Sequence, residues 1–255
     1  MIDNSATVLY EQYIEEISMT LVIENIHKSF GNNHVFEGAS TEIKKGRIYA
    51  LLGRNGSGKT TLFDLISSRK PLDEGSISIE EDGIRREIDQ RDLFYMVANP
   101  YLPNFMTSRE FLSFFIDVNQ DHIREERTID ELFDWIELRS LERDKLISSY
   151  SLGTRNKLQM LMFLLLRPPI ILMDEPLTSL DVVVQLQIKK LLKEIEEDHI
   201  IIFSTHILQL ARDLCDELII LNDKRLSLID DNRLQDQDYE QNIIELLREK
   251  GDEHV

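Results

Sequence analysis

Short apolar runs separated by amphipathic stretches occur along most of the chain, and this rhythm predicts strands that alternate with helices. The runs are rich in isoleucine and leucine, as strands buried on both faces are. They span residues 48–52, 93–98, 170–173, 200–203, 218–221 and 226–229. Helices are expected after the first run, up to about residue 70, and over 182–197. This alternation favours an α/β fold with a mostly parallel sheet, which binds ligands at the carboxyl ends of its strands.

Two regions depart from this rhythm. Residues 20–26 form a strand-like run near the N-terminus, and residues 76–80 alternate strictly between polar and apolar, as a half-exposed strand does. From about residue 103 to 166 the pattern becomes helical, with few strand signals. We therefore expect a helical lobe inserted between strands.

Two capping boxes mark helix starts within this lobe. Thr107 with Glu110, and Thr128 with Glu131, have the Thr-x-x-Glu spacing in which side chains bond backbone N–H groups reciprocally. The first box is followed by a stripe at helical spacing, made of Phe111, Phe114, Phe115 and Val118. Such a stripe is more often the core of a lobe than a partner surface, by roughly three to one.

Both ends of the chain hold further helix candidates. Residues 1–18 place Tyr10, Tyr13, Ile14 and Ile17 at helical spacing among acidic residues, which predicts a short amphipathic helix ahead of the main domain. In the polar tail, residues 243–247 are a second candidate.

Composition excludes several classes of protein. The 255 residues are 42% hydrophobic, and 29 Lys and Arg against 47 Asp and Glu give a net charge of −18, which repels nucleic acid and anionic lipid surfaces. A single cysteine, Cys215, excludes an internal disulfide and fits a reducing compartment. No stretch reaches the roughly twenty apolar residues that cross a bilayer, and no secretory signal is visible.

Candidate chemistry begins with residues 53–61, GRNGSGKTT, which fit the phosphate-binding pattern GxxxxGKT between a predicted strand and a predicted helix. Glycines let the backbone wrap its N–H groups around phosphate oxygens, and the positive end of the helix dipole adds to the attraction. Lys59 would reach the terminal phosphates and the Thr60 hydroxyl a magnesium ion. A chance match is on the order of one in a hundred for a chain of this size.

Two other segments contain residues that are suited to binding a metal ion or an anion. Asp174 and Glu175 follow the apolar run 170–173 directly, where a carboxylate could organise a metal opposite the loop. Taken alone, an Asp-Glu pair at a strand end could equally cap the next helix. Ser151 and Gly153 lie at the start of another predicted helix, which could form a second anion site.

The order of these motifs resembles the ATP-binding cassette of ABC transporters, over about residues 21–229. GRNGSGKTT resembles its Walker A motif, IILMDEP its Walker B motif with the adjoining glutamate, and YSLGT its signature sequence; TSLD resembles the D-loop and STH the switch histidine. The resemblance implies a P-loop NTPase core in residues 19–230, with an antiparallel β subdomain on the N-terminal side and an inserted α-helical subdomain at about 103–166. Residues 1–18 would then be an extension, and 231–255 an acidic tail with a short helix.

The resemblance also assigns roles. Phe30, by itself more simply a core residue, would stack on adenine. Glu175 would be the general base, His206 would contact the γ-phosphate, and Lys59 would act on the terminal phosphates. Magnesium would be held by Thr60, Asp174 and Asn99. The implied ATP-binding residues are Phe30, Gly53, Arg54, Asn55, Gly56, Ser57, Gly58, Lys59, Thr60, Thr61, Ser151, Gly153, Thr154 and Asp181.

The chain departs from the family pattern at three positions. Asn99 stands where the family has glutamine, which keeps the amide but shortens the side chain by one methylene. In the signature, Leu152 replaces a glycine and Thr154 replaces glutamine. Ser151 and Gly153, which face phosphate in the family, are present, so we expect a functional half-site.

The expected function follows from the resemblance. Ser151 and Gly153 are out of reach of residues 53–61 in their own chain, so a second cassette, identical or paralogous, would close each ATP site. The main hypothesis is the ATPase subunit of an ABC transporter, preferably an exporter, that drives a separately encoded transmembrane partner from the cytoplasmic face of the plasma membrane. Alternatives are a soluble assembly ATPase, as in iron–sulfur scaffold loading, and a poorly hydrolysing regulatory module, against which Glu175 and His206 argue.

Overall fold

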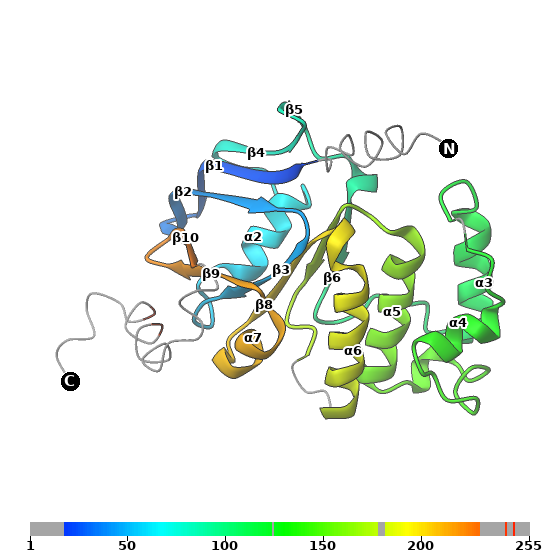
Figure 1. Cartoon of the computed structure of the whole chain (residues 1–255). Coiled ribbons are helices and arrows are strands. Elements are labelled where there is room, and N and C mark those ends of the chain that lie inside the picture. Colours follow the sequence, from blue (N-terminus) through cyan, green and yellow to red (C-terminus); the bar gives the residue numbers. More distant parts are fainter. Residues whose placement is uncertain (1–17, 124, 178–181, 230–242, 244–246, 248–255) are drawn as a thin grey trace, which may run out of the picture.

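The computed structural model describes residues 18–123, 125–177, 182–229, 243 and 247. Two β-sheets form its frame (Figure 1). The larger sheet consists, in spatial order, of β10 (Arg225–Ile229), β9 (Glu217–Asn222), β3 (Arg47–Leu52), β8 (Ile200–Thr205), β7 (Ile170–Met173) and β6 (Leu93–Met96). All neighbours in this sheet are parallel except β10, which pairs antiparallel with β9. The predicted α/β fold with a mostly parallel sheet is confirmed.

The smaller sheet is antiparallel and lies on the N-terminal side of the fold. Its strands, in spatial order, are β2 (Asn33–Lys44), β1 (Met19–Phe30), β4 (Glu74–Glu81) and β5 (Ile84–Arg86).

Six helices and three short 3-10 turns are described. They are α2 (Lys59–Ile66), η1 (Gln90–Asp92), α3 (Ser108–Val118), α4 (Ile129–Trp135), η2 (Ile147–Ser149), α5 (Leu152–Leu166), α6 (Val182–Ile195), η3 (Glu196–Asp198) and α7 (Leu208–Leu214). The helix expected over 182–197 therefore ends as α6 at Ile195 and continues as a 3-10 turn.

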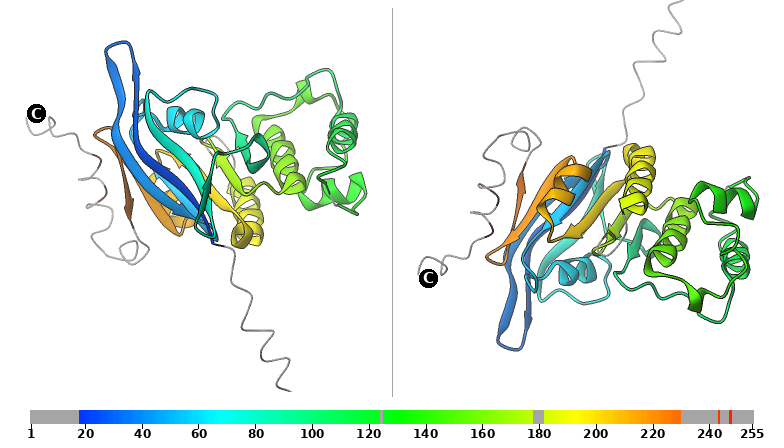
Figure 2. Two further views of the ribbon diagram at one scale, coloured as in Figure 1. Left: turned by 90° about the horizontal axis from the view of Figure 1, so that it is seen from above. Right: turned by 90° about the horizontal axis from the view of Figure 1, so that it is seen from below.

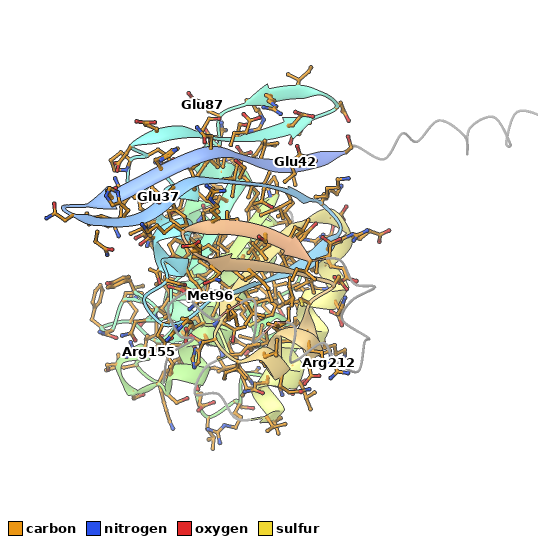
Figure 3. The ribbon with its side chains drawn as sticks, turned by 90° about the vertical axis from the view of Figure 1, so that its left-hand side faces the viewer. Glu37, Glu42, Glu87, Met96, Arg155 and Arg212 are labelled. Carbon is orange, nitrogen blue, oxygen red and sulfur yellow. The ribbon has the colours of Figure 1, made fainter. Side chains whose placement is uncertain are left out.

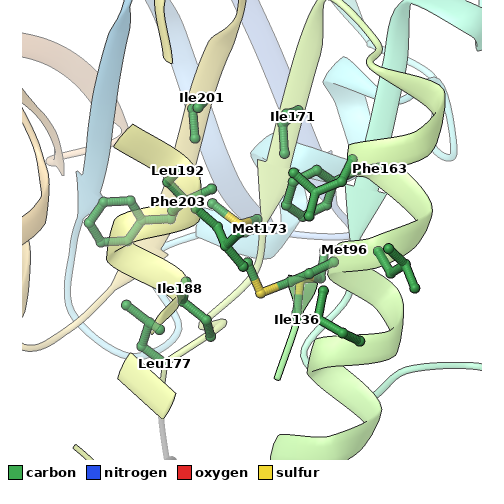
Figure 4. Packing of buried hydrophobic residues seen from close by; sticks show 14 of the residues in the cluster. Met96, Ile136, Phe163, Ile171, Met173, Leu177, Ile188, Leu192, Ile201 and Phe203 are labelled. Atoms are coloured by element: carbon green, nitrogen blue, oxygen red, sulfur yellow. The ribbon is translucent and has the colours of Figure 1, made fainter. Parts of the chain in front are cut away.

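Alternating side chains of the parallel strands build two cores, one on each face of the large sheet. In β8, Ile200 and Ile202 belong to a cluster with α2 and the antiparallel sheet, whereas Ile201 and Phe203 belong to a cluster with α5, α6 and α7. Figure 4 shows the second cluster, whose members include Met173 of β7, Phe203 of β8 and Ile188 of α6. The parallel strands are apolar along most of their length because both of their faces are covered.

The helices α3 and α4 lie beyond α5, at the end of the molecule away from the antiparallel sheet (Figures 1 and 2). Both predicted capping boxes are confirmed. The Glu110 N–H donates to Thr107 Oγ1 at 3.2 Å while Glu110 Oε2 accepts from the Thr107 N–H at 2.9 Å, and Thr128 with Glu131 repeats the exchange.

The stripe of four residues was expected to belong to the core of the lobe, and this is correct for two of them. Phe111 is buried and Phe115 packs partly against the core, but Phe114 and Val118 are exposed. Val118 is the last residue of α3, and Phe114 is rotated about 60° around the helix axis from Phe111.

The antiparallel sheet contains strands that the pattern did not predict. β1 continues past residue 26 to Phe30, and β2 and β5 were not predicted. The pairing of β1 with β2 shifts register at several points, which breaks the two-residue period of apolar positions. β2 is also an edge strand of its sheet and exposes charged side chains such as Glu37 and Glu42 (Figure 3).

Other predictions fall where the structure describes little. Apart from Ser18, the helix predicted at 1–18 lies outside the described residues. So does most of the candidate helix at 243–247, although Ile243 is buried and Leu247 packs against the core. Among the described helices, none combines the length and apolar character needed to cross a membrane.

The burial of His199 leads to a prediction of how the free energy of unfolding depends on pH. His199 Nδ1 donates to the Pro168 carbonyl at 2.7 Å, and burial lowers the pKa of this imidazole below its usual value near 6.5. The folded state therefore binds fewer protons than the unfolded state, so the stabilisation is complete above about pH 6.5 and is lost as the pH falls below it.

We expect the free energy of unfolding to fall less between pH 7.5 and 5.5 in His199→Asn than in the native protein, because asparagine keeps an N–H donor but does not titrate. Urea unfolding at both pH values measures this, with exposed His122→Asn as the control. Equal pH dependence in His199→Asn and the native protein would contradict the prediction.

Candidate active site

The loop 53–58 joins the central strand β3 to the helix α2 and is shaped by two tight glycine positions. Gly58 has φ 112°, and a Cβ atom there would lie 2.5 Å from a Val35 methyl group. A Cβ atom at Gly53 would lie 2.6 Å from Ser57 Oγ and 3.1 Å from the Leu221 carbonyl oxygen. The backbone of the loop packs so closely against its neighbours that both positions require glycine, which has no Cβ atom.

Lys59 lies inside this loop with its ammonium group held by the loop itself. Its Nζ donates to the carbonyl oxygens of Gly53 at 2.8 Å and Arg54 at 3.1 Å. Burial lowers the pKa of Lys59, and the negative charges of Glu175 and Asp174 partly oppose that shift. The side chain is thus positioned where phosphate oxygens could replace the carbonyl acceptors.

A cavity of about 320 Å³ opens beside the loop. It is lined by Asn55, Gly56, Gly58, Lys59, Thr60, Thr61, Ala98, Asp174 and Glu175. A second hollow of about 610 Å³ shares Asn55 and Gly56 with it and extends over Arg54, Ser57, residues 33–35 and residues 221–224. The two hollows together include most residues of the loop 53–58 in their lining.

Asp174 follows the carboxyl end of β7 and is only 6% exposed. One carboxylate oxygen accepts from Thr60 Oγ1 at 2.7 Å and the other from Ser204 Oγ at 2.6 Å. The structure therefore brings together Thr60 and Asp174, two of the residues predicted to hold magnesium. Oxygen donors of this kind suit Mg²⁺, which uses one or two carboxylates together with phosphate oxygens and water.

Glu175 contacts the predicted switch histidine. Its Oε1 lies 3.1 Å from His206 Nδ1, and its backbone N–H donates to Ser204 Oγ at 2.9 Å. Glu175 also has φ 47°, a left-handed conformation that is uncommon for a residue with a side chain. The Glu175 carboxylate and the phosphate-loop lysine therefore line one cavity, and the histidine contacts that carboxylate.

The sequence placed Ser204 at a strand end within STH but gave it no role of its own, although it contacts both acidic residues. The parallel register pairs Met173 with Phe203, so Ser204 lies beside Asp174 at the carboxyl edge of the sheet. A hydroxyl at the end of an otherwise apolar run was the available signal.

The structure places the signature residues away from the cavity. Ser151 is the N-cap of α5, where its Oγ accepts from the Thr154 N–H at 3.2 Å and lies 2.9 Å from Thr154 Oγ1. Ser151, Gly153 and Thr154 are all missing from the residues that line the described cavity.

The remaining candidates are placed less directly. Phe30, at the end of β1, is 46% exposed, and the Lys28 and Lys70 Nζ atoms each lie 5.4 Å from its ring centroid; it lines neither hollow. Ala98 and Asn99 are both exposed, but only Ala98 lines the cavity; β6 ends at Met96, two residues before the predicted end. Asp181, with the rest of TSLD, lies outside the described residues.

Comparison with known proteins agrees with this geometry. The family model described as ABC transporter matches residues 36–178. The ABC transporter ATP-binding protein YdbJ of Bacillus subtilis (strain 168) is 32% identical over 230 residues, which are 89% of this chain and 74% of that protein. A probable sulfate/thiosulfate import ATP-binding protein, CysA of Chlorella vulgaris, is 27% identical over 82% of this chain and 89% of its own.

Solved structures show the same fold. The ATP-binding subunit of an ABC transporter superposes with a TM-score of 0.70 at 22% identity, over 90% of this chain and 95% of its own. A dimeric ATP-binding cassette in a post-hydrolysis state, bound to ADP and Pi, gives a TM-score of 0.66 at 21% identity, over 83% and 98%.

The predicted family, fold and ATPase activity are therefore confirmed: the chain belongs to the ABC transporter family, as an ATP-binding subunit that hydrolyses ATP.

Proposed function

We propose that this chain powers an exporter, by ATP-dependent pairing of two cassettes that drives a separately encoded transmembrane partner. The observation that carries the hydrolytic part is the group formed by Lys59, Thr60, Asp174 and Glu175 around one cavity, with His206 in contact with Glu175. Export is favoured by the resemblance of YSLGT to exporter signatures, while relatives such as CysA are named for import.

Phosphate binding uses groups that are already positioned. Backbone N–H groups at 55–61 and the N-terminus of α2 attract the phosphates, and Lys59 exchanges its loop carbonyl acceptors for phosphate oxygens. Thr60 and Asp174 would hold Mg²⁺, whereas the predicted third ligand, Asn99, is exposed and does not line the cavity. When bound, that ion neutralises charge that develops on the transferred phosphoryl group.

Glu175 acts as the general base in this proposal. Its carboxylate lies at the cavity wall, where it can orient a water molecule toward the γ-phosphate and accept its proton. His206 contacts the same carboxylate and would steer the γ-phosphate.

The signature end of α5 closes the site of a second cassette. Ser151, Gly153 and Thr154 do not line the described cavity of their own chain, and a capped helix N-terminus is suited to an anion. Asp181 would contribute at the same interface, and Phe30 would stack on adenine by displacing the two lysine ammonium groups from its face.

A transmembrane partner requires a docking surface linked to the site. Tyr101 and Phe105 are 89% and 82% exposed, and they follow the cavity residue Ala98 within a few positions. Exposed apolar surface of this kind, where it is contiguous, marks an interaction site. We propose that Tyr101 and Phe105 bind a cytoplasmic segment of the membrane partner. A movement of these two side chains would then be transmitted along the chain to Ala98 in the cavity wall.

Replacement of the proposed base tests the hydrolytic assignment. Glu175→Gln should keep ATP binding, lose turnover by about two to four powers of ten, and accumulate as a dimer with ATP in gel filtration. Glu126→Gln, on the exposed surface of the lobe, is the control. A Glu175→Gln variant that stays monomeric with unchanged turnover would contradict the proposal.

The magnesium assignment is tested at Thr60 with two variants of similar size. Thr60→Val removes the hydroxyl. The Mg²⁺ concentration for half-maximal turnover should therefore rise by about tenfold or more, which corresponds to a loss of about 1.4 kcal/mol in the free energy of Mg²⁺ binding. Thr60→Ser keeps the hydroxyl and should resemble the native protein. Equal Mg²⁺ requirements in the two variants would exclude Thr60 as a ligand.

The docking surface is tested by co-purification from membranes. The double variant Tyr101→Ala/Phe105→Ala should lose the membrane partner that the native chain retains, as identified by mass spectrometry. Leu141→Ala, at a position 84% exposed elsewhere in the lobe, should keep it. Retention of the same partner by the double variant would place the docking surface elsewhere.

A further inference from the structure

The backbone of Glu175 is strained and is held from two sides. Its φ of 47° lies in the left-handed region, and the next residue is Pro176, which disfavours helical conformations at the position before it. Such a conformation persists only where neighbouring groups enforce it. The side chains that enforce it therefore decide where the Glu175 carboxylate points.

Ser204 holds the residue on its N-terminal side. This side chain is fully buried at the end of β8, where its hydroxyl accepts from the Glu175 N–H at 2.9 Å and donates to Asp174 at 2.6 Å. One hydroxyl can do both because it has one donor and two acceptor sites.

Asn156 holds the chain on the other side. It is 2% exposed on α5, and its Nδ2 donates to the Pro176 carbonyl at 3.2 Å. The Asn156 Oδ1 atom is buried and has no hydrogen-bond partner among the described residues. Burying a polar side chain is costly unless it forms hydrogen bonds. The bond from Asn156 to the Pro176 carbonyl therefore accounts for an amide at this position.

Asn156 also connects two distant parts of the proposed machinery. It lies in the same helix as Ser151, the N-cap at the signature end of α5. A helix moves as a rigid body, so a displacement of that end is transmitted through Asn156 to the Pro176 carbonyl, next to Glu175.

We propose that Asn156 and Ser204 are positioning residues that orient Glu175, and that Asn156 couples this orientation to the signature end of α5. The inference rests on the proposed role of Glu175 as general base. Neither residue lines the cavity, so each acts through the backbone at 174–176 rather than on ATP.

The test compares Asn156→Leu with Gln159→Leu in the full chain. Gln159 is a matched control because it is a buried amide one turn further along α5, and it also has an unsatisfied side-chain oxygen among the described residues. Asn156→Leu should lower kcat for ATP by about 10- to 100-fold, as expected for a misplaced catalytic group, with the ATP dissociation constant within threefold of native. Gln159→Leu should keep native turnover.

Three further variants separate positioning from general damage. Asn156→Asp keeps the volume but lacks the N–H donor, so it should lose turnover like Asn156→Leu. Ser204→Ala should also lower kcat more than it weakens ATP binding. In the double variant Asn156→Leu/Glu175→Gln, turnover should equal that of Glu175→Gln, because effects of groups that act as a unit do not add.

The outcomes distinguish this inference from the proposed function. Native turnover in both Asn156 variants beside an inactive Glu175→Gln would overturn the positioning role alone. Equal losses in Asn156→Leu and Gln159→Leu, with weakened ATP binding in both, would show a structural role and overturn it as well. Full turnover in Glu175→Gln would overturn the proposed function on which it rests.

Discussion

The site depends on the hydrogen bonds that the Asp174 carboxylate accepts. This carboxylate is almost completely buried, and a buried charge is tolerated only when hydrogen bonds and opposite charges compensate for lost hydration. Here Thr60 comes from the phosphate-loop helix and Ser204 from the neighbouring strand, while the backbone N–H of Asp174 donates to the Met96 carbonyl at 2.8 Å. Three elements that are distant in sequence are therefore fixed to one another at the edge of the sheet.

The layered architecture explains why the site lies at this edge. Helices and a second sheet cover both faces of the parallel strands, so polar groups are accommodated where the strands end. Lys59, Asp174, Glu175 and His206 all lie at or just beyond carboxyl ends of strands or in the loop that follows one. The apolar interior supplies rigidity, and the strand ends supply the chemistry.

The helix α5 has a different task from the other helices. It is buried along most of its length, and its Phe163 ring packs edge-on against Phe94 of β6 at 5.8 Å between centroids. It also shares one apolar cluster with residues of α3 and α4. A helix packed against both the sheet and the lobe is suited to transmit displacement between them, and its N-terminus carries the signature residues that a second cassette would use.

The sequence by itself determined the features that depend on neighbours in the chain: the phosphate loop at 53–61, the apolar parallel strands, both capping boxes and the strand-end pair Asp174 and Glu175. Local periodicity and turn chemistry are sufficient for these. Only the tertiary structure decided that Ser204 contacts both acids, that Ala98 rather than Asn99 lines the cavity, and that Asn156 reaches Pro176. Those contacts depend on the register between parallel strands and on how α5 packs against them, which no local pattern encodes. β2 was missed for a related reason, because its register shifts and its exposed charged positions remove the alternation that marks a strand.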